Sequence, residues 1–403
     1  MSSSSHAAYA GRVSRSTTIG VIGGGQLARM MYAPAIALDV NLRLLAEGPD
    51  VGAARVFKDV TVGDYTDEAI VREFAAGCDV ITFDHEHVPT RILRGLVDEG
   101  LLVRPGPEAL EHAQDKLLMR ERLTRTLDAP APAWRRCPDE AALRAFGDEV
   151  GWPIIAKASR GGYDGHGVWK LDGPQDAAKP FAESLDASAG ETVQIIGEEF
   201  VDFARELSVI VVRSPSGQAV AYPVSETVQR DGVCRETITP APGLPDEQAA
   251  AITKLGLDIA DDLRVVGVLA VELMQRTDGS VVVNELAMRP HNTGHWTIDG
   301  ARTSQFENHL RAVLDLPLGD PRLRDDWCVM VNVLGGTVTD LTSELLHCFA
   351  RDPRLRVEFY GKGVRPGRKV GHVVTYGENL DDVLGRARHA ARYLMGEIRE
   401  GQS

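Results

Sequence analysis

The segment SRGGYDGHGVW, residues 159–169, combines a high density of glycine with side chains that could contact a phosphate group. It follows the apolar run WPIIAK, which ends in Lys157. Its glycines are Gly161, Gly162, Gly165 and Gly167. Glycine in a strand or turn costs conformational entropy, so such clustering marks turns with positive φ or the close approach of a ligand. The segment alone leaves two interpretations open, an ordinary hairpin turn and a loop that covers phosphates.

Residues 266–287 predict two acidic side chains that face each other across a hairpin. Asp278-Gly279 is typical of a two-residue type I′ turn. With these two residues as the turn, Glu272 lies directly opposite Glu285, an arrangement that like charges destabilise. Apolar neighbours on that face argue against simple solvation of both acids, although a different register would also separate them. A cation between the carboxylates resolves the conflict, and their hard oxygen atoms suit Mg²⁺, or Mn²⁺ in its place.

A lysine at a strand end, a glycine-rich loop and a distant acid pair together indicate an ATP phosphate site. The site is not a Walker P-loop, because the pattern GxxxxGK[ST] is absent from the sequence. Backbone N–H groups of residues 161–167 would surround the phosphates, and Lys157 would contact them. Lys116, in HAQDKLLMR, is a second candidate for phosphate contact, with a solvated helix lysine as the alternative.

Composition excludes several classes of protein. The formal net charge of −14 argues against general nucleic-acid binding. The five cysteines form no CxxC pair, so a reduced, cytoplasmic protein is expected. Residues 1–16 are small and polar, which predicts a disordered tail rather than a signal peptide. No apolar run approaches the ~20 residues that a membrane span needs.

The pattern of strands and helices predicts an α/β domain followed by α+β segments. Residues 17–113 show a βαβ pattern typical of a parallel sheet, with later strands expected at 41–48 and 80–88. A helix from Asp115 to about Leu127 opens a second domain, residues 114–312, in which antiparallel strands and hairpins prevail. Residues 313–403 are expected to form a small α+β domain.

The turn GGGQLAR after the first strand is similar to a dinucleotide-binding fingerprint. Ala28 replaces the third glycine, and Glu47 supplies an acid at the end of the second strand. A helix N-terminus at this place can hold a phosphate or a ribose without any nicotinamide cofactor. An oxidoreductase would also leave everything after residue 150 unexplained.

These features together resemble the ATP-grasp superfamily, and within it the 5-(carboxyamino)imidazole ribonucleotide synthase family. The matching motifs are GGGQLARM, the lysine of QDK, AKASRGGYDGHG, NELAMRPHNTGHW and RPGRKVGH, which span nearly the whole chain. GGYDGxG and NELAxRxHNxGHW are specific in combination, whereas ASR before the loop and the first 16 residues have no distinctive match. The resemblance implies a pre-ATP-grasp domain at 17–113, an ATP-grasp domain at 114–312 and a C-terminal domain at 313–403.

The resemblance also implies roles for individual residues. Within the ATP site, Gly162 to Val168 would close over the phosphates, Glu198 to Val201 would meet adenine, and Glu206 would bind the ribose hydroxyls. The implied ATP ligands are Lys116, Lys157, Gly162, Tyr163, Asp164, Gly165, His166, Gly167, Val168, Glu198, Glu199, Phe200, Val201, Glu206, Gln229, Asn284 and Glu285. Glu272 and Glu285 would hold the metal. The implied catalytic residues, which would line the bicarbonate and aminoimidazole pocket, are Arg289, His291, Tyr163 and Asp164. The implied contacts to the rest of the substrate and its 5′-phosphate are Gly25, Gln26, Lys362, Arg365, Arg368 and Lys369.

The reaction implied is carboxylation of the exocyclic amine of 5-aminoimidazole ribonucleotide in purine biosynthesis. Bicarbonate is a poor electrophile, so phosphorylation by ATP would first convert it to carboxyphosphate. The family also suggests a homodimer and a functional link to the mutase that uses the product. Two alternatives stay open: another ATP-grasp ligase, such as a formate-using glycinamide ribonucleotide transformylase, and a non-catalytic nucleotide sensor. A biotin carboxylase fits less well, because its larger closing domain has no counterpart in the short C-terminal segment.

Overall fold

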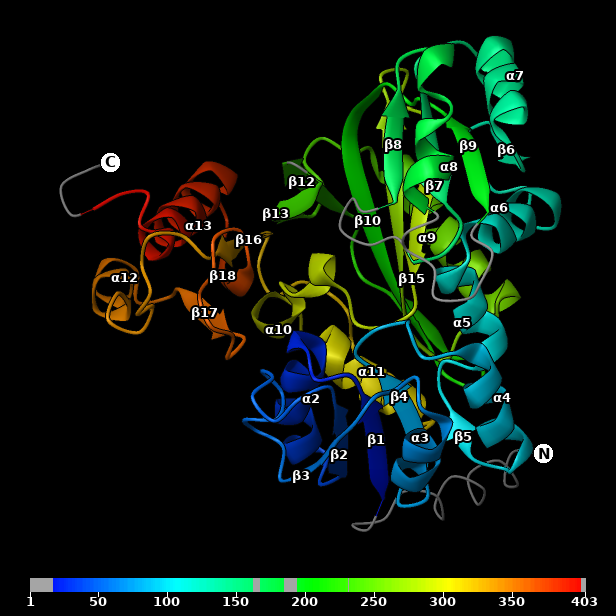
Figure 1. The fold of residues 1–403 in the computed structure, drawn as a ribbon. Helices are drawn as coiled ribbons and strands as arrows, with labels where there is room; N and C mark the ends of the chain where they lie inside the picture. The colour runs from blue at the N-terminus through cyan, green and yellow to red at the C-terminus, as the bar shows by residue number, and fades with distance from the viewer. Residues whose placement is uncertain (1–16, 162–166, 185–193, 231, 400–403) are drawn as a thin grey trace, which may run out of the picture.

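A computed structural model describes residues 17–161, 167–184, 194–230 and 232–399 (Figure 1). The expected tail at residues 1–16 lies outside the described residues. So do five residues of the predicted phosphate loop, namely Gly162, Tyr163, Asp164, Gly165 and His166.

The N-terminal domain is built on a parallel sheet of five strands in the order β3-β2-β1-β4-β5. The strands are β1 Thr18–Ile22, β2 Asn41–Ala46, β3 Asp59–Val62, β4 Val80–Phe83 and β5 Leu102–Val103. Its helices are α2 Gln26–Ala37, α3 Glu68–Ala75, α4 Thr90–Asp98 and α5 Pro107–Gln114. The central strands are buried on both faces, which explains their nearly continuous apolar sequences. The expected third strand is shorter than predicted, because Asp84 and Glu86 leave the sheet to bind backbone N–H groups of other segments.

A second, antiparallel sheet carries the ends of the glycine-rich segment, in the order β6-β9-β7-β8. Its strands are β6 Trp134–Cys137, β7 Ile154–Ala158, β8 Val168–Leu171 and β9 Ile195–Glu199. The helices before and around it are α6 Lys116–Arg125, α7 Glu140–Val150 and α8 Lys179–Ser184. Lys157 on β7 pairs with Val168 on β8, which confirms that the glycine-rich segment joins two antiparallel strands.

A third sheet of nine strands runs through the rest of the chain. Its strands are β10 Phe203–Arg213, β11 Ala219–Ala221, β12 Ser225–Arg230, β13 Val233–Thr239, β14 Gly267–Arg276, β15 Val281–Ala287, β16 Trp327–Leu334, β17 Arg356–Phe359 and β18 Lys369–Gly377. Its helices are α9 Asp246–Asp262, α10 Thr297–Gly300, α11 Gln305–Val313, α12 Leu345–Arg351 and α13 Leu380–Met395. Strand β13 pairs with β16, so the C-terminal segment extends the central sheet instead of forming a separate one.

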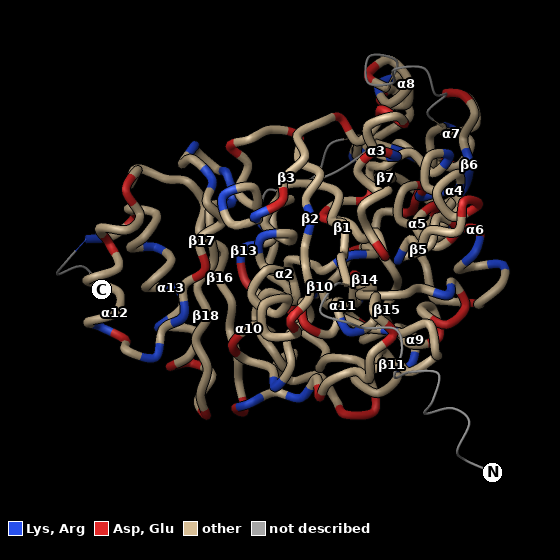
Figure 2. Tube along the Cα trace, turned by 90° about the horizontal axis from the view of Figure 1, so that it is seen from below, with Lys and Arg blue, Asp and Glu red and all other residues tan. Residues whose placement is uncertain are grey.

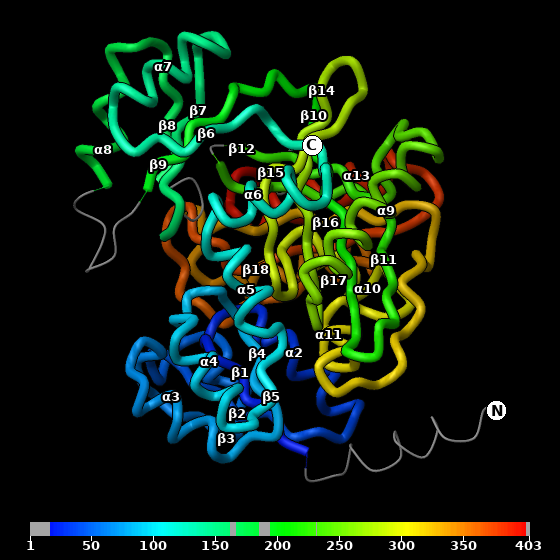
Figure 3. The backbone as a smooth tube through the Cα atoms, turned by 90° about the vertical axis from the view of Figure 1, so that its right-hand side faces the viewer, coloured from blue at the N-terminus to red at the C-terminus, as the bar shows by residue number. Residues whose placement is uncertain are grey.

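The parallel sheet and the β6–β9 sheet lie toward opposite ends of the nine-stranded sheet (Figures 1 and 3). One apolar core joins the N-terminal domain to the central sheet, since Val88 and Leu110 cluster with Val283, Leu286 and Met288. This core fixes the loop after β4 against the end of β15. Figure 2 shows Lys and Arg interspersed with Asp and Glu along the chain. None of the described helices has the length and apolar character required to cross a membrane.

Candidate active site

Two carboxylates face each other on the nine-stranded sheet, as the sequence predicts. Glu272 on β14 pairs with Glu285 on β15. Glu206 lies on the same face, because Glu272 also pairs with Ser208, two residues along β10 from Glu206. Burial and the neighbouring carboxylates of Glu285 and Glu206 raise the pKa of Glu272 to about 7. Burial likewise raises the pKa of Glu206 to about 7. This face therefore concentrates acidic groups whose charging a cation would favour.

The turn of this hairpin differs from the prediction. The Arg276 N–H donates to the Ser280 carbonyl at 2.8 Å, and the Gly279 N–H donates to the Arg276 carbonyl at 3.0 Å. The loop is therefore three residues long, residues 277–279, and Gly279 takes a φ of +88° that suits glycine.

A bulge restores the predicted pairing of the two acids. Leu273 pairs with Val283, whereas Glu272 pairs with Glu285, so Asn284 is the extra residue on β15. The turn is one residue longer than predicted and the bulge adds one residue to β15, so the two shifts in register cancel and Glu272 still faces Glu285.

Two lysines from different elements reach this acidic face. Lys116 Nζ, at the start of α6, lies 2.5 Å from Glu285 Oε1. Lys157 Nζ, from β7, lies 2.7 Å from Glu198 Oε2 and donates to Asn284 Oδ1 at 3.3 Å. Although burial opposes ionisation of Glu285, the Lys116 ammonium lowers its pKa below the ordinary value. Lys116 is therefore not a solvated helix lysine, and both predicted phosphate lysines lie at one place.

Arg120, which the sequence analysis missed, joins the two sheets beneath these lysines. It is fully buried, and its Nε lies 2.6 Å from Glu198 Oε1. Its two terminal nitrogens donate to the carbonyls of Val283 and Asn284, both at 2.8 Å. Arg120 follows Lys116 by one helical turn, a spacing that places both on neighbouring positions of α6 and was the available signal.

The side chains of residues 198–201, which are predicted to meet adenine, contact different partners. The Glu198 carboxylate is 2% exposed and is taken up by Lys157 and Arg120. Although burial opposes its ionisation, these two cations lower its pKa to about 2. Its side chain thus positions Lys157, and only its backbone remains for an adenine contact.

The following residues lie where the chain passes from β9 to β10. Glu199 forms an ion pair with Arg276, Val201 is buried, and Phe200 is 42% exposed with Lys170 Nζ 5.0 Å from its ring centre. Gln229 lies at an irregularity of β12, opposite Cys234 on β13. Of the loop itself, Gly161 and Gly167 adopt φ values of +76° and +68°, which confirms the expected positive-φ backbone at its two ends.

Arg289 and His291, which are predicted to line a bicarbonate pocket, lie just after β15 and next to the acid pair. Arg289 Nε lies 2.6 Å from Glu86 Oε2, and Glu86 Oε1 accepts the Met288 N–H at 3.1 Å. His291 Nε2 lies 3.4 Å from Glu272 Oε1. Burial and the Arg289 and Lys369 cations lower the pKa of His291 well below its ordinary value, so the ring is neutral. Glu86 was missed by sequence analysis, although the acidic stretch DHEHV after a buried strand could have indicated it.

The basic side chains of segment 362–369 lie in different places. Lys362 Nζ donates to Gln26 Oε1 at 2.5 Å, which brings it to the glycine turn of the N-terminal domain. Lys369, at the start of β18, acts electrostatically on Glu272 and His291. Arg365 and Arg368 are exposed, and Arg368 donates to the Gly363 carbonyl at 3.3 Å. The structure thus brings Lys362 to Gln26 and Lys369 near Glu272 and His291, and the two arginines between them in sequence are exposed to a ligand from solvent.

The glycine turn is already occupied by a carboxylate. Asp84 accepts the Gly25 N–H at 3.1 Å and the Ala28 N–H at 2.7 Å. These are the donors at the N-terminus of α2 that a dinucleotide pyrophosphate would use. The dinucleotide interpretation is therefore disfavoured by the contacts of Asp84.

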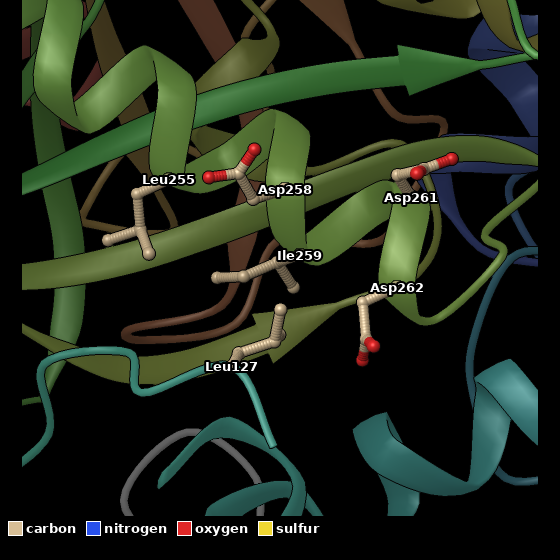
Figure 4. Close-up of a pocket in the computed structure, with 6 residues that line it drawn as sticks. All are labelled: Leu127, Leu255, Asp258, Ile259, Asp261 and Asp262. Carbon is tan, nitrogen blue, oxygen red and sulfur yellow. The ribbon is translucent and has the colours of Figure 1, made fainter.

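A pocket of about 340 Å³ beside α9 is separate from this site (Figure 4). It is lined by Leu127, Leu255, Asp258, Ile259, Asp261 and Asp262. Its three acids pair with Lys254, Arg213 and Arg122 respectively, at 2.5, 2.9 and 2.7 Å. Because each carboxylate already has a cationic partner, the pocket offers no uncompensated charge to a ligand.

Comparison with known proteins gives matches over nearly the whole chain. Family profiles match as follows: "Ribonucleotide synthetase preATP-grasp domain" at residues 16–114, "ATP-grasp domain" at 122–306 and "Phosphoribosylaminoimidazole carboxylase C-terminal domain" at 328–386. The chain is 52% identical over 380 residues to the N5-carboxyaminoimidazole ribonucleotide synthase of Mycobacterium tuberculosis, covering 93% of this chain and 87% of that protein.

Solved structures of the same kind superpose along the chain. The N5-carboxyaminoimidazole ribonucleotide synthetase of Thermus thermophilus matches with a TM-score of 0.82 and 35% identity, covering 94% of this chain and 99% of that one. The N5-carboxyaminoimidazole synthase of Aspergillus clavatus, solved with ADP and 5-aminoimidazole ribonucleotide, matches with a TM-score of 0.84 and 27% identity over 94% and 100% of the two chains.

Proposed function

The chain belongs to the N5-carboxyaminoimidazole ribonucleotide synthase family of ATP-grasp ligases, and we propose that it uses bicarbonate and ATP to carboxylate the exocyclic amine of 5-aminoimidazole ribonucleotide. The observation that carries this proposal is the continuity of the site. Lys116 contacts Glu285, Glu285 faces Glu272, and His291 next to Arg289 contacts Glu272. The residues proposed to bind phosphate, the metal and bicarbonate therefore follow one another through direct contacts.

The carboxylates fit a magnesium ion. Glu272 and Glu285 face each other, and Glu206 stands on the same face. The described residues contain no group of three or more His, Cys, Asp or Glu arranged to hold a metal. Mg²⁺ matches this donor set, because it takes one or two carboxylates and fills its remaining positions with water and substrate phosphates. When bound, it would supply positive charge to the phosphates of ATP, as would Mn²⁺ in its place.

The lysines and the buried arginine would handle the phosphates. Lys116 and Lys157 now rest against Glu285 and Glu198, and each can turn its ammonium group to a phosphate oxygen while Arg120 keeps Glu198 in place. Neutralising charge on the transferring phosphoryl group is the main contribution a protein makes to this chemistry. The loop residues Gly162 to Val168 are proposed to cover the phosphates, and residues 198–201 with Gln229 the adenine.

Arg289 would orient bicarbonate beside the γ-phosphate. One bicarbonate oxygen attacks the γ-phosphorus, the bond to ADP breaks, and carboxyphosphate forms. The amine nitrogen then attacks the carboxyl carbon, and the C–O bond to phosphate breaks as the amine proton is lost. Glu86 holds the Arg289 guanidinium, and the neutral His291 adds no positive charge near the amine nitrogen, which becomes positive as it attacks.

The remaining parts of the proposal concern partners and setting. Lys362 and Lys369, with Arg365 and Arg368, would bind the 5′-phosphate beside Gly25 and Gln26. We further propose a cytoplasmic homodimer whose product passes to a mutase.

Phosphate release from ATP tests this function against its alternatives. The assay combines ATP and Mg²⁺ with bicarbonate and 5-aminoimidazole ribonucleotide, and omits each in turn. Phosphate release that requires both is the expected result. Release with formate and glycinamide ribonucleotide instead would indicate a transformylase, and nucleotide binding without any release would indicate a sensor.

A further inference from the structure

A group of polar side chains lies at the carboxyl edge of the parallel sheet and has no role in the function proposed above. Glu47 follows β2 and His85 follows β4, while β1 with its glycine turn lies between these two strands. The order β3-β2-β1-β4-β5 changes direction beside β1. In open α/β sheets, ligands bind outside the carboxyl ends of the strands at such a point.

Glu47 is fixed in position but retains free acceptor capacity. The Gly24 N–H donates to its Oε2 at 3.0 Å, and His85 Nε2 lies 3.3 Å from its Oε1. The Glu47 side chain is nevertheless 42% exposed. A carboxylate offers about four lone-pair sites, so each oxygen can still accept from a ligand on the open side.

The orientation of His85 is set by its other nitrogen. The His87 N–H donates to His85 Nδ1 at 3.1 Å, so Nδ1 is an acceptor and Nε2 faces Glu47. Tyr65 packs on the ring with centres 4.4 Å apart. Contact with His85 is the main reason that the pKa of Glu47 falls to about 2, which leaves the carboxylate ionised and purely an acceptor.

The residues near Glu47 indicate where a phosphate-bearing ligand would lie. Lys362, proposed above as a phosphate contact, reaches Gln26, two residues after Gly24. The loop after Glu47 returns to the same place, since a Cβ atom at Gly52 would lie 3.9 Å from the Lys362 side chain. Lys362 and Glu47 therefore border the same glycine turn, so the sugar of a nucleotide with its phosphate at Lys362 would lie near Glu47.

We propose that Glu47, held by Gly24 and His85, is the acceptor for the ribose 2′- and 3′-hydroxyls of the nucleotide substrate. The assignment rests on the proposed function, because it presumes a ribonucleotide with its 5′-phosphate at Lys362. An ionised carboxylate that only accepts is matched to two neighbouring hydroxyl donors. It discriminates against analogues that lack a hydroxyl, because its remaining lone pairs then lose their partners.

Substrate analogues test this assignment in wild type and in Glu47→Gln. The 2′-deoxy and 3′-deoxy forms of 5-aminoimidazole ribonucleotide are compared with the parent substrate. In the wild type, losing one hydroxyl should lower kcat/KM about 10- to 100-fold, the effect of one hydrogen bond to a charged group. Glu47→Gln should lose a similar factor with the parent substrate, mainly through KM, and lose little more with the analogues.

Matched measurements separate this contact from a general effect of charge or folding. Asp50→Asn removes one exposed negative charge from the loop after Glu47 and should leave the KM for the ribonucleotide unchanged. KM for ATP should not change in either variant. The assignment is overturned if the wild type turns over both deoxy analogues as fast as the parent substrate, a result that does not depend on any variant. It is also overturned if kcat/KM falls by the same factor with the analogues in Glu47→Gln and in the wild type. A wild type that is inactive with the parent substrate would instead overturn the proposed function itself.

Discussion

Lys116 Nζ lies 2.5 Å from Glu285 Oε1, so an ammonium group from helix α6 contacts a carboxylate that the sequence marks as a metal ligand. The contact explains why two acids can face each other on one sheet without mutual repulsion dominating. When ATP and a cation bind, the lysine can move to a phosphate and the cation can take its place at the carboxylate.

Replacing Glu285 by Gln should abolish most Mg²⁺-dependent ATP cleavage. We expect a fall of about 100-fold or more, comparable with the loss of one preorganised charged group at a reacting centre. Unfolding stability should not rise, because the substitution leaves Lys116 without its carboxylate. Steady-state phosphate release measures the first effect and urea unfolding the second.

Glu247→Gln is the control for Glu285→Gln, since it removes an exposed carboxylate from α9. It should leave ATP cleavage unchanged. Near-normal turnover in Glu285→Gln would refute the metal assignment.

Replacing the buried Arg120 by Met should destabilise the protein strongly. The substitution leaves the Glu198 carboxylate buried with only Lys157 beside it, and breaking a buried pair in this way costs about 3–5 kcal/mol. The free energy of unfolding measured in urea gives the answer. Arg122 lies on the same helix as Arg120, and Arg122→Met, which removes its half-exposed ion pair with Asp262 of α9, should cost about 1 kcal/mol or less. Equal losses in the two variants would contradict the structural role given to Arg120.

Separate substitutions of Lys362 and Arg368 by Ala test whether each side chain binds the 5′-phosphate of the substrate. Charge-assisted hydrogen bonds are worth about 1.5–3 kcal/mol, so either loss should raise KM for 5-aminoimidazole ribonucleotide about 10- to 100-fold. KM for ATP should hardly move, and the defect should shrink with the dephosphorylated riboside. Arg354→Ala, at an exposed arginine of the same domain, is the control. If neither variant weakens the substrate selectively, the phosphate lies elsewhere.

Protein stability should fall as the pH drops from 6.5, because histidines are buried in their neutral form. His309 is fully buried between Thr82 and the Val268 N–H, and burial lowers its pKa from 6.5 to about 3. The unfolded chain takes up a proton below pH 6.5 and the folded chain does not, so this group costs about 1.4 kcal/mol per pH unit between these values.

His309→Gln isolates that contribution. Urea unfolding between pH 6.5 and 5 should show a slope about 1.4 kcal/mol per pH unit smaller in the variant than in the wild type. Glu272 and Glu206, whose pKa values are raised to about 7, act in the opposite direction in this window but cancel in the comparison. Parallel slopes would show that His309 is protonated in the folded state.

The sequence predicted the order of elements well because strand, turn and helix-start signals are local. Helix α6 begins after Asp115, whose carboxylate accepts two backbone N–H groups of the first turn. The facing of Glu272 and Glu285 was predicted correctly, although the turn is one residue longer, because the bulge at Asn284 offsets the error. That bulge depends on carbonyl contacts with Arg120, more than 160 residues away in sequence.

The missed residues share the same cause. Glu86 is defined by its contact with Arg289, 203 residues away, and Arg120 by its contact with Glu198, 78 residues away. Which side chain meets which at such separations depends on packing between domains. No local pattern contains that information.

Transfer of a bicarbonate oxygen to phosphate tests the central claim most directly. The enzyme is given ¹⁸O-labelled bicarbonate, ATP, Mg²⁺ and 5-aminoimidazole ribonucleotide, and the released phosphate is examined by mass spectrometry. If bicarbonate attacks the γ-phosphorus and the amine then displaces phosphate from the carboxyl carbon, each phosphate formed with product carries one labelled oxygen. Unlabelled phosphate formed together with carboxylated product would contradict the account.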